Sequence, residues 1–177
     1  MDVFLQPLSA LLASVPRVNA AHAILLALFL AYLPHWIRVF ACVRPALAGA
    51  GAGYDVRYTR ESVARATDLK TETGRTIARL SGAHQNGLEA FAACAAAVCL
   101  ALVTKRMPTA DLDSAATAFL ALRLLYVYLY ATGVQAWKGP ARSIVWVMSA
   151  YVVVKIMIDS SPAAVFAAPP RAKPALW

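Results

Sequence analysis

Four apolar segments, each long enough to cross a lipid bilayer, constrain this sequence more than any other feature. A transmembrane helix needs about 20 mainly apolar residues. The four segments cover about residues 18–40, 79–104, 111–132 and 141–158. Hydrophobic residues make up 60% of the 177-residue chain and charged residues 15%, and the mean hydropathy is +0.59. The sequence therefore predicts an all-α integral membrane protein, a single four-transmembrane-helix bundle.

The two ends of the chain differ from this membrane domain, which we place at residues 18–158. Residues 1–17 form an apolar lead-in without the basic start of a secretory signal or the Arg-rich pattern of a transit peptide. Residues 159–177 form a proline-rich tail that is not expected to cross the membrane. We expect this tail to be ordered only where another subunit or the chain's own surface holds it.

The net charge of +8 is explained by basic residues beside the membrane spans, and no nucleic-acid-binding pattern is present. Four spans place both termini on one side and the loops 44–78 and 133–140 on the other. Lys and Arg are more frequent on the loop side, so the positive-inside rule places these loops in the cytosol or its equivalent. An endomembrane, a mitochondrial membrane and a bacterial inner membrane all remain open as compartments.

No metal site is predicted, because the cysteines and histidines are scattered and show no metal-ligand spacing. We expect His84 to pack against a neighbouring helix and Arg38 to serve as an interfacial anchor. The hydrophilic segment 44–78 mixes both charge signs, which favours a solvated loop with local ion pairs, and Thr71–Gly74 is expected to be a loop leading into the second span.

The second span opens with a polar stripe. At about 100° per residue, Arg79, Gly82, Asn86 and Glu89 fall on one helical face. An ionisable side chain in the hydrocarbon costs at least a few kcal/mol unless it is paired or faces a wet cavity. One interpretation is a Glu89 held by a neighbouring arginine for packing alone, and the other is a polar pocket between helices.

Connectivity brings further polar residues to the same leaflet. Arg123, Tyr126 and Tyr130 share one face near the loop-side end of the third span, and Arg142 opens the fourth. The tyrosines alone are also typical of an aromatic belt and Arg142 of a basic flank, while Arg123 is a candidate counter-ion for Glu89.

A pocket of this composition suits a small zwitterionic peptide that carries a thiol. Arginines favour carboxylates through charge-assisted bonds, and Glu89 and Asn86 suit an ammonium and amide groups. A tyrosine hydroxyl and an arginine beside a ligand thiol stabilise its thiolate. The bilayer would supply an apolar co-substrate.

At these positions the sequence resembles the MAPEG family, membrane-associated proteins in eicosanoid and glutathione metabolism. Tyr54-Asp55 and Thr59-Arg60 are similar to a segment of its bacterial and fungal branch. The main motifs are Ala83-His84-Gln85-Asn86-Gly87-Leu88-Glu89, Arg123-Leu-Leu-Tyr126-Val-Tyr-Leu-Tyr130 and Arg142-Ser143-Ile-Val-Trp146.

The resemblance implies a trimer of four-helix bundles with glutathione bound between subunits. It implies Arg142 as the thiolate stabiliser and Tyr130 beside the thiol, which makes these two the candidate catalytic residues. The candidate cofactor-binding residues that the resemblance implies are Arg79, Asn86, Glu89 and Tyr126. We add Arg123, which shares a helical face with Tyr126.

Two departures from the family pattern concern the site. Gly82 stands where the well-characterised transferases have arginine, and Tyr126 where they usually have histidine. The resemblance therefore leaves two hypotheses: a glutathione-dependent transferase or peroxidase acting on lipophilic substrates, or a non-catalytic accessory subunit of a larger membrane complex. Under both hypotheses we expect the protein to contact membrane lipid and to form a homotrimer or part of a larger membrane complex.

Overall fold

The computed structural model describes residues 16–49 and 54–161, and this part of the chain is helical with short connections. Nearly all of the expected proline-rich tail and of the expected N-terminal lead-in lies outside the described residues, and the first two tail residues, Asp159 and Ser160, belong to the last helix. The elements in chain order are α2 (Ala20–Ile37), the π-helical turn η1 (Arg38–Val43), α3 (Arg44–Gly49), the 3₁₀ turn η2 (Val56–Tyr58), α4 (Thr59–Ala66), α5 (Glu72–Thr104), α6 (Thr109–Ala131) and α7 (Lys138–Ser160).

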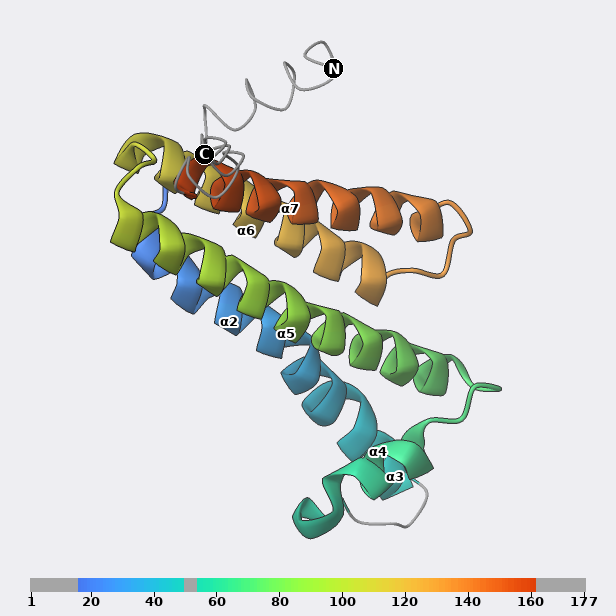
Figure 1. The fold of residues 1–177 in the computed structure, drawn as a ribbon. Coiled ribbons are helices and arrows are strands. Elements are labelled where there is room, and N and C mark those ends of the chain that lie inside the picture. The colour runs from blue at the N-terminus through green and yellow to red at the C-terminus, as the bar shows by residue number, and fades with distance from the viewer. Residues whose placement is uncertain (1–15, 50–53, 162–177) are drawn as a thin grey trace, which may run out of the picture.

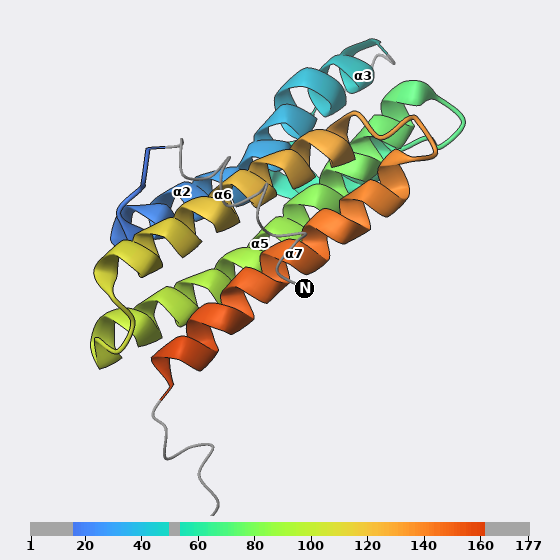
Figure 2. The ribbon, with the colours of Figure 1, turned by 90° about the horizontal axis from the view of Figure 1, so that it is seen from above.

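The described residues contain four helical stretches that are long and apolar enough to cross a membrane, which confirms the predicted all-α membrane fold. They are Ala20–Gly49, Glu72–Thr104, Thr109–Ala131 and Lys138–Ser160. The helices run side by side along one axis, with α2 beside α5 and α6 beside α7 (Figures 1 and 2). Many large apolar side chains are exposed, such as Leu25, Phe40 and Ile144. Such a surface suits contact with lipid.

Small residues let α2 and α5 pack closely. Ala23, Ala27 and Ala31 of α2 are buried on the face toward α5. A Cβ added at Gly87 of α5 would lie 2.9 Å from the Ala31 Cα. Small residues at helix interfaces are the usual way in which membrane helices approach each other. Further along α5, the small residues Cys94, Ala97 and Ala101 belong to the buried core of the bundle.

The start of α2 is capped partly by another helix. Asn19 accepts a hydrogen bond from the Ala21 N–H, as an N-cap residue does. Asp113 Oδ1 of α6 accepts the Ala20 N–H at 2.7 Å, and Thr117 Oγ1 accepts the Val18 N–H at 2.9 Å. Two backbone donors that the helix itself leaves free are thus satisfied by α6.

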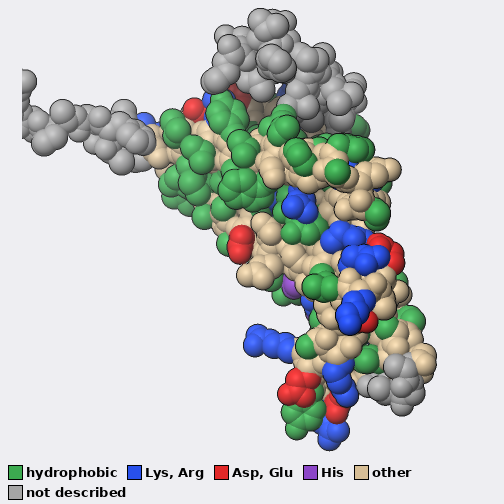
Figure 3. Space-filling model, turned by 90° about the vertical axis from the view of Figure 1, so that its right-hand side faces the viewer, with side chains coloured by type: hydrophobic (Ala, Val, Ile, Leu, Met, Phe, Trp, Pro, Cys, Tyr) green, Lys and Arg blue, Asp and Glu red, His purple; other side chains and the backbone are tan. Residues whose placement is uncertain are grey.

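The loop-side segment is more helical than the sequence suggested. The helical path that starts at Ala20 continues through η1 to Gly49, and α4 packs against it through Val43, Leu47 and Ala66. The expected loop at Thr71–Gly74 is wrong, because Thr71 is the N-cap of α5 and accepts the Gly74 N–H. Charged side chains gather at this end and hydrophobic ones over the rest of the bundle (Figure 3). Within this segment Arg57 pairs with Asp55 and lowers the pKa of that carboxyl below its ordinary value.

Candidate functional site

An open groove at the loop-side end of the bundle brings together four of the predicted site residues. It has a volume of about 430 Å³ and is formed by α5, α6 and α7. Asn86, Tyr126, Tyr130 and Arg142 all line it. Residues that are far apart in the sequence therefore meet in one place, as the connectivity argument predicted. Ser143, Trp146 and Val147 complete the lining.

Two arginines and two tyrosines form a stacked row in and beside this groove. The Arg123 guanidinium lies 4.3 Å from the centre of the Tyr126 ring, and that of Arg142 lies 4.2 Å from the Tyr130 ring. The two rings meet edge to face at 5.4 Å. Stacking on a ring holds a guanidinium without using its N–H groups. Among the described residues Arg142 forms no hydrogen bond or ion pair, so its donors remain available to a ligand.

Gly82 determines where the Tyr130 hydroxyl lies. A Cβ added at Gly82 would be 2.6 Å from the Tyr130 hydroxyl oxygen, so the phenol occupies the space of a side chain at this position. Asn86 Nδ2 donates to the Gly82 carbonyl oxygen at 3.1 Å, which orients the amide beside the same hydroxyl. The glycine that departs from the family pattern is therefore matched to the tyrosine that occupies its space.

Arg123 does not pair with Glu89. It is 4% exposed, and its Nη2 donates to the Asn86 main-chain oxygen at 3.2 Å. Its Nη1 is a buried donor without a partner in the described part of the chain. Helical periodicity placed Arg123 on the right face of α6, but Asn86 rather than Glu89 is the α5 residue that it contacts. It supports the groove from behind and is not part of its lining.

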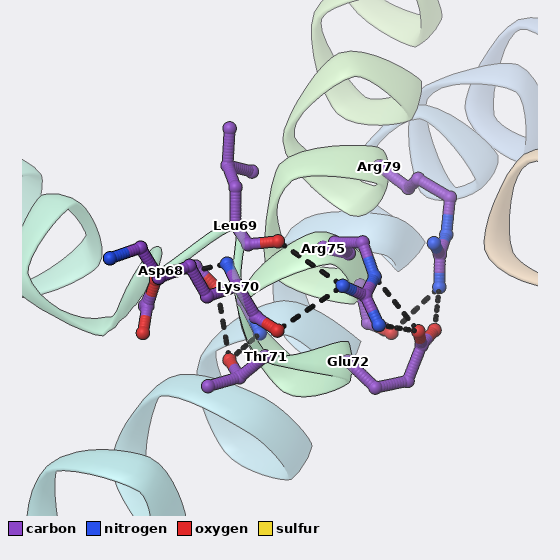
Figure 4. A network of polar contacts seen from close by, with 9 residues as sticks. Asp68, Leu69, Lys70, Thr71, Glu72, Arg75 and Arg79 are labelled. Atoms are coloured by element: carbon purple, nitrogen blue, oxygen red, sulfur yellow. Dashed lines mark hydrogen bonds and ion pairs between the residues drawn. The ribbon is translucent and has the colours of Figure 1, made fainter.

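A polar network at the start of α5 holds the Arg79 side chain (Figure 4). Its Nη2 donates to Glu72 Oε1 and to Thr76 Oγ1, both at 2.8 Å. Glu72 also pairs with Arg75, which donates to the Leu69 carbonyl oxygen. Arg79 is not among the residues that line this groove, because α5 begins early enough to bring Glu72 within reach. Its contact with a ligand stays a prediction.

Glu89 lies in a second, mainly apolar groove between α5 and α7. This groove has a volume of about 270 Å³, and Ala93, Phe119 and Val153 line it together with Glu89. Trp146 lines both grooves and connects them. Glu89 is exposed and has no hydrogen bond or ion pair among the described residues. A carboxylate within a membrane span is therefore open to the face where α5 and α7 meet.

Trp146 closes the Arg142-Ser143-Ile-Val-Trp146 motif, but the sequence analysis assigned it no role; the structure places it in the lining of both grooves. His84 does pack against a neighbour as expected, since its Nδ1 donates to the Ala31 carbonyl oxygen at 2.8 Å. Arg38 does not extend into solvent as an anchor. It turns inward because Ser81 and His35 accept its hydrogen bonds.

Among the described residues no three His, Cys, Asp or Glu side chains form a metal site.

The fold and the groove define a class of protein: an integral, multi-pass membrane bundle of four helices with a polar groove near one end. A family model describes this class, since the MAPEG family model matches residues 21–159. The chain belongs to the MAPEG family, and the match covers all four membrane helices. No curated protein and no solved structure matches the chain.

Proposed function

We propose that the protein is a glutathione-dependent transferase or peroxidase that acts on lipophilic substrates. One observation carries this proposal. Arg142 is held against the Tyr130 ring at 4.2 Å, keeps its donors free among the described residues, and faces the groove that Asn86 also lines. An unpaired guanidinium beside a phenol hydroxyl is the environment that favours a bound thiolate over a thiol.

The groove residues suit the other groups of glutathione. Arg142 and the Tyr126 hydroxyl offer donors to its carboxylates and amide oxygens, whereas the Ser143 hydroxyl already donates to the Gly139 carbonyl oxygen. The Asn86 oxygen offers an acceptor for its amide N–H, since the Asn86 nitrogen is already bonded to the Gly82 carbonyl. With the thiol beside Tyr130 and Arg142, these residues would bind and orient the peptide and lower the pKa of its sulfur.

The exposed Glu89 carboxylate is the second support. An unpaired carboxylate in a membrane span costs at least a few kcal/mol, so a positive group is expected to cover it. The α-ammonium of glutathione and a basic residue of another copy in a trimer both meet that need. The apolar groove beyond Glu89 would admit a lipophilic electrophile or hydroperoxide sideways from the bilayer.

An accessory role in a larger membrane complex is the second candidate. The observation that favours it is that Arg79 and Arg123 are engaged with Glu72 and with the Asn86 backbone, which leaves Arg142 as the one arginine among the described lining residues of the groove. A bundle that only holds other subunits in the membrane binds no ligand, so its arginines can be used for contacts within the chain, as Arg79 and Arg123 are.

Calorimetry of glutathione binding to the purified protein separates the two candidates. Wild type, Glu89→Gln/Arg142→Ala and the control Arg44→Ala should be compared, because Arg44 is an exposed arginine outside both grooves. We expect saturable binding by wild type and by the control, and loss of binding in the double variant. Conjugation and peroxidase assays with lipophilic substrates then assign the reaction. No binding by folded wild-type protein would refute the glutathione proposal and leave the accessory role.

A further inference from the structure

A second polar cavity lies away from the groove, between the end of α2 and α4. Its volume is about 160 Å³, and it shares no lining residue with the groove at Arg142. Its polar lining is made of His35, Arg38, Tyr54, Thr59 and Arg60. We propose that this cavity binds a phosphate group, either the headgroup of an anionic phospholipid or free phosphate. The proposal is independent of glutathione.

The charge of the cavity carries the proposal. Arg38 and Arg60 both line it, and none of its described lining residues is acidic. Arg60 forms no ion pair among the described residues, whereas the nearby Asp55 is already paired with Arg57 at 3.0 Å. Two uncompensated arginines in one concave site attract an anion, and guanidinium groups match phosphate oxygens well.

The Arg38 side chain is held in place within the helices. Its Nη1 donates to Ser81 Oγ at 2.9 Å, and its Nη2 lies 2.8 Å from His35 Nδ1. Arginine only donates, so His35 Nδ1 is the acceptor and the neutral ring carries its proton on Nε2. The Arg38 Nε is a buried donor without a partner in the described part of the chain. A buried donor of this kind is expected to have an acceptor, which a bound anion or its water would supply.

Neutral donors complete the site from the other wall. The hydroxyls of Tyr54 and Thr59 line the cavity and can each donate to an oxyanion. Thr59 and Arg60 also open α4, where the N-cap residue makes no side-chain cap hydrogen bond. The partial positive charge of this helix start adds to that of the arginines. The volume is well below the about 300–1,000 Å³ of drug-sized ligand sites, which favours a small group such as phosphate.

The position of Arg38 along the first membrane helix fits the depth at which lipid phosphates are found, when the start of α2 is taken as the opposite membrane surface. Arg38 follows the 18 residues of α2, which rise by about 27 Å at about 1.5 Å per residue. The hydrocarbon core of a bilayer is about 30 Å thick. Arg38 is therefore near the loop-side headgroup layer, where the positive-inside orientation also predicts anionic lipid. A phospholipid headgroup can reach the site from the membrane, and free phosphate from the aqueous side.

The test compares two arginine variants with a matched control. Arg60→Gln removes an exposed side chain that lines the cavity, and Arg38→Gln removes the fixed guanidinium. Arg44→Gln removes an equally charged, exposed residue that stacks on Phe40 and does not line the cavity. Inorganic phosphate is titrated into each protein in detergent by calorimetry. Retained lipid is measured by native mass spectrometry after reconstitution in phosphatidylcholine nanodiscs with phosphatidylglycerol. Circular dichroism and size-exclusion chromatography check the fold.

If free phosphate is the ligand, wild type and Arg44→Gln bind inorganic phosphate, and Arg60→Gln binds it about tenfold more weakly. If the ligand is a lipid headgroup, inorganic phosphate gives no signal, while phosphatidylglycerol stays on wild type and Arg44→Gln and is lost from Arg60→Gln. Should Arg38→Gln not fold, Arg60→Gln alone decides the result. The proposal is overturned if Arg60→Gln and Arg44→Gln behave alike in both measurements.

Discussion

Replacing Gly82 with alanine tests how the Tyr130 hydroxyl is positioned over the groove. The new Cβ would lie 2.6 Å from the Tyr130 hydroxyl oxygen, whereas ordinary contact begins at 3.4 Å. The phenol must therefore retreat by about 0.8 Å, the difference between these two distances. Overpacking costs typically about 1–3 kcal/mol, and alanine regains about 0.8–1.0 kcal/mol over glycine within a helix. We expect Gly82→Ala to be neutral or destabilising by up to about 2 kcal/mol.

The measurement is the free energy of unfolding in mixed detergent micelles, determined for a double-mutant cycle with Tyr130→Phe. This second substitution deletes the oxygen that the Cβ meets and leaves the ring carbon Cζ at 3.1 Å as the nearest atom. Gly82→Ala should then cost less in the Tyr130→Phe protein than in wild type, with a coupling energy of about 1 kcal/mol or more. Gly49→Ala is the control, because no atom lies within 4 Å of its added Cβ. An equal effect of Gly82→Ala with and without the hydroxyl would refute the reasoning.

Three further substitutions test the packing and the polar contacts, each through the same unfolding measurement. Gly87→Ala should cost about 1–2 kcal/mol after the helix-propensity gain of alanine is subtracted, because its Cβ would meet the Ala31 backbone, which cannot rotate away; no loss of stability would contradict the close α2–α5 contact. Asp113→Ala should cost about 1 kcal/mol, the usual value of a lost helix cap, because the Ala20 N–H loses its acceptor; an unchanged stability would mean that water replaces the carboxylate. Glu72→Gln should change stability by less than about 1 kcal/mol, because its ion pairs with Arg75 and Arg79 are on the protein surface; a larger loss would show that the network at the start of α5 stabilises the fold.

The membrane fold was predictable because four long apolar segments leave a chain few alternatives. The meeting of Asn86, Tyr126, Tyr130 and Arg142 was predictable for a related reason, since short connections and helical periodicity place all four at the same end of the bundle. Both predictions rest on geometry that every helix shares and need no knowledge of individual side-chain contacts.

The individual contacts were not predictable in this way. Periodicity assigns Arg123 to a face but does not choose between Glu89 and the Asn86 backbone as its partner. Arg79 is engaged by Glu72 because α5 starts at Glu72, within the stretch expected to be a loop. The short helix α4 was predicted to be a solvated loop, because its charges are of mixed sign and few of its residues, such as Ala66, are buried. For Arg79 and for α4 the deciding feature is the boundary of a helix, and for Arg123 it is the choice of a backbone oxygen over a side chain; composition determines neither.

The contacts at the start of α2 also bear on how the protein is made. A nascent chain delivers its helices to the membrane in sequence order, so α2 arrives before α6. The Ala20 and Val18 N–H groups find their acceptors on Asp113 and Thr117, which are 93 and 99 residues further along the chain. Until α6 has entered the bilayer, water or another partner must take those hydrogen bonds. Among the described residues, the first membrane helix is thus completed by contacts from the third, so its final packing depends on a later stage of membrane insertion.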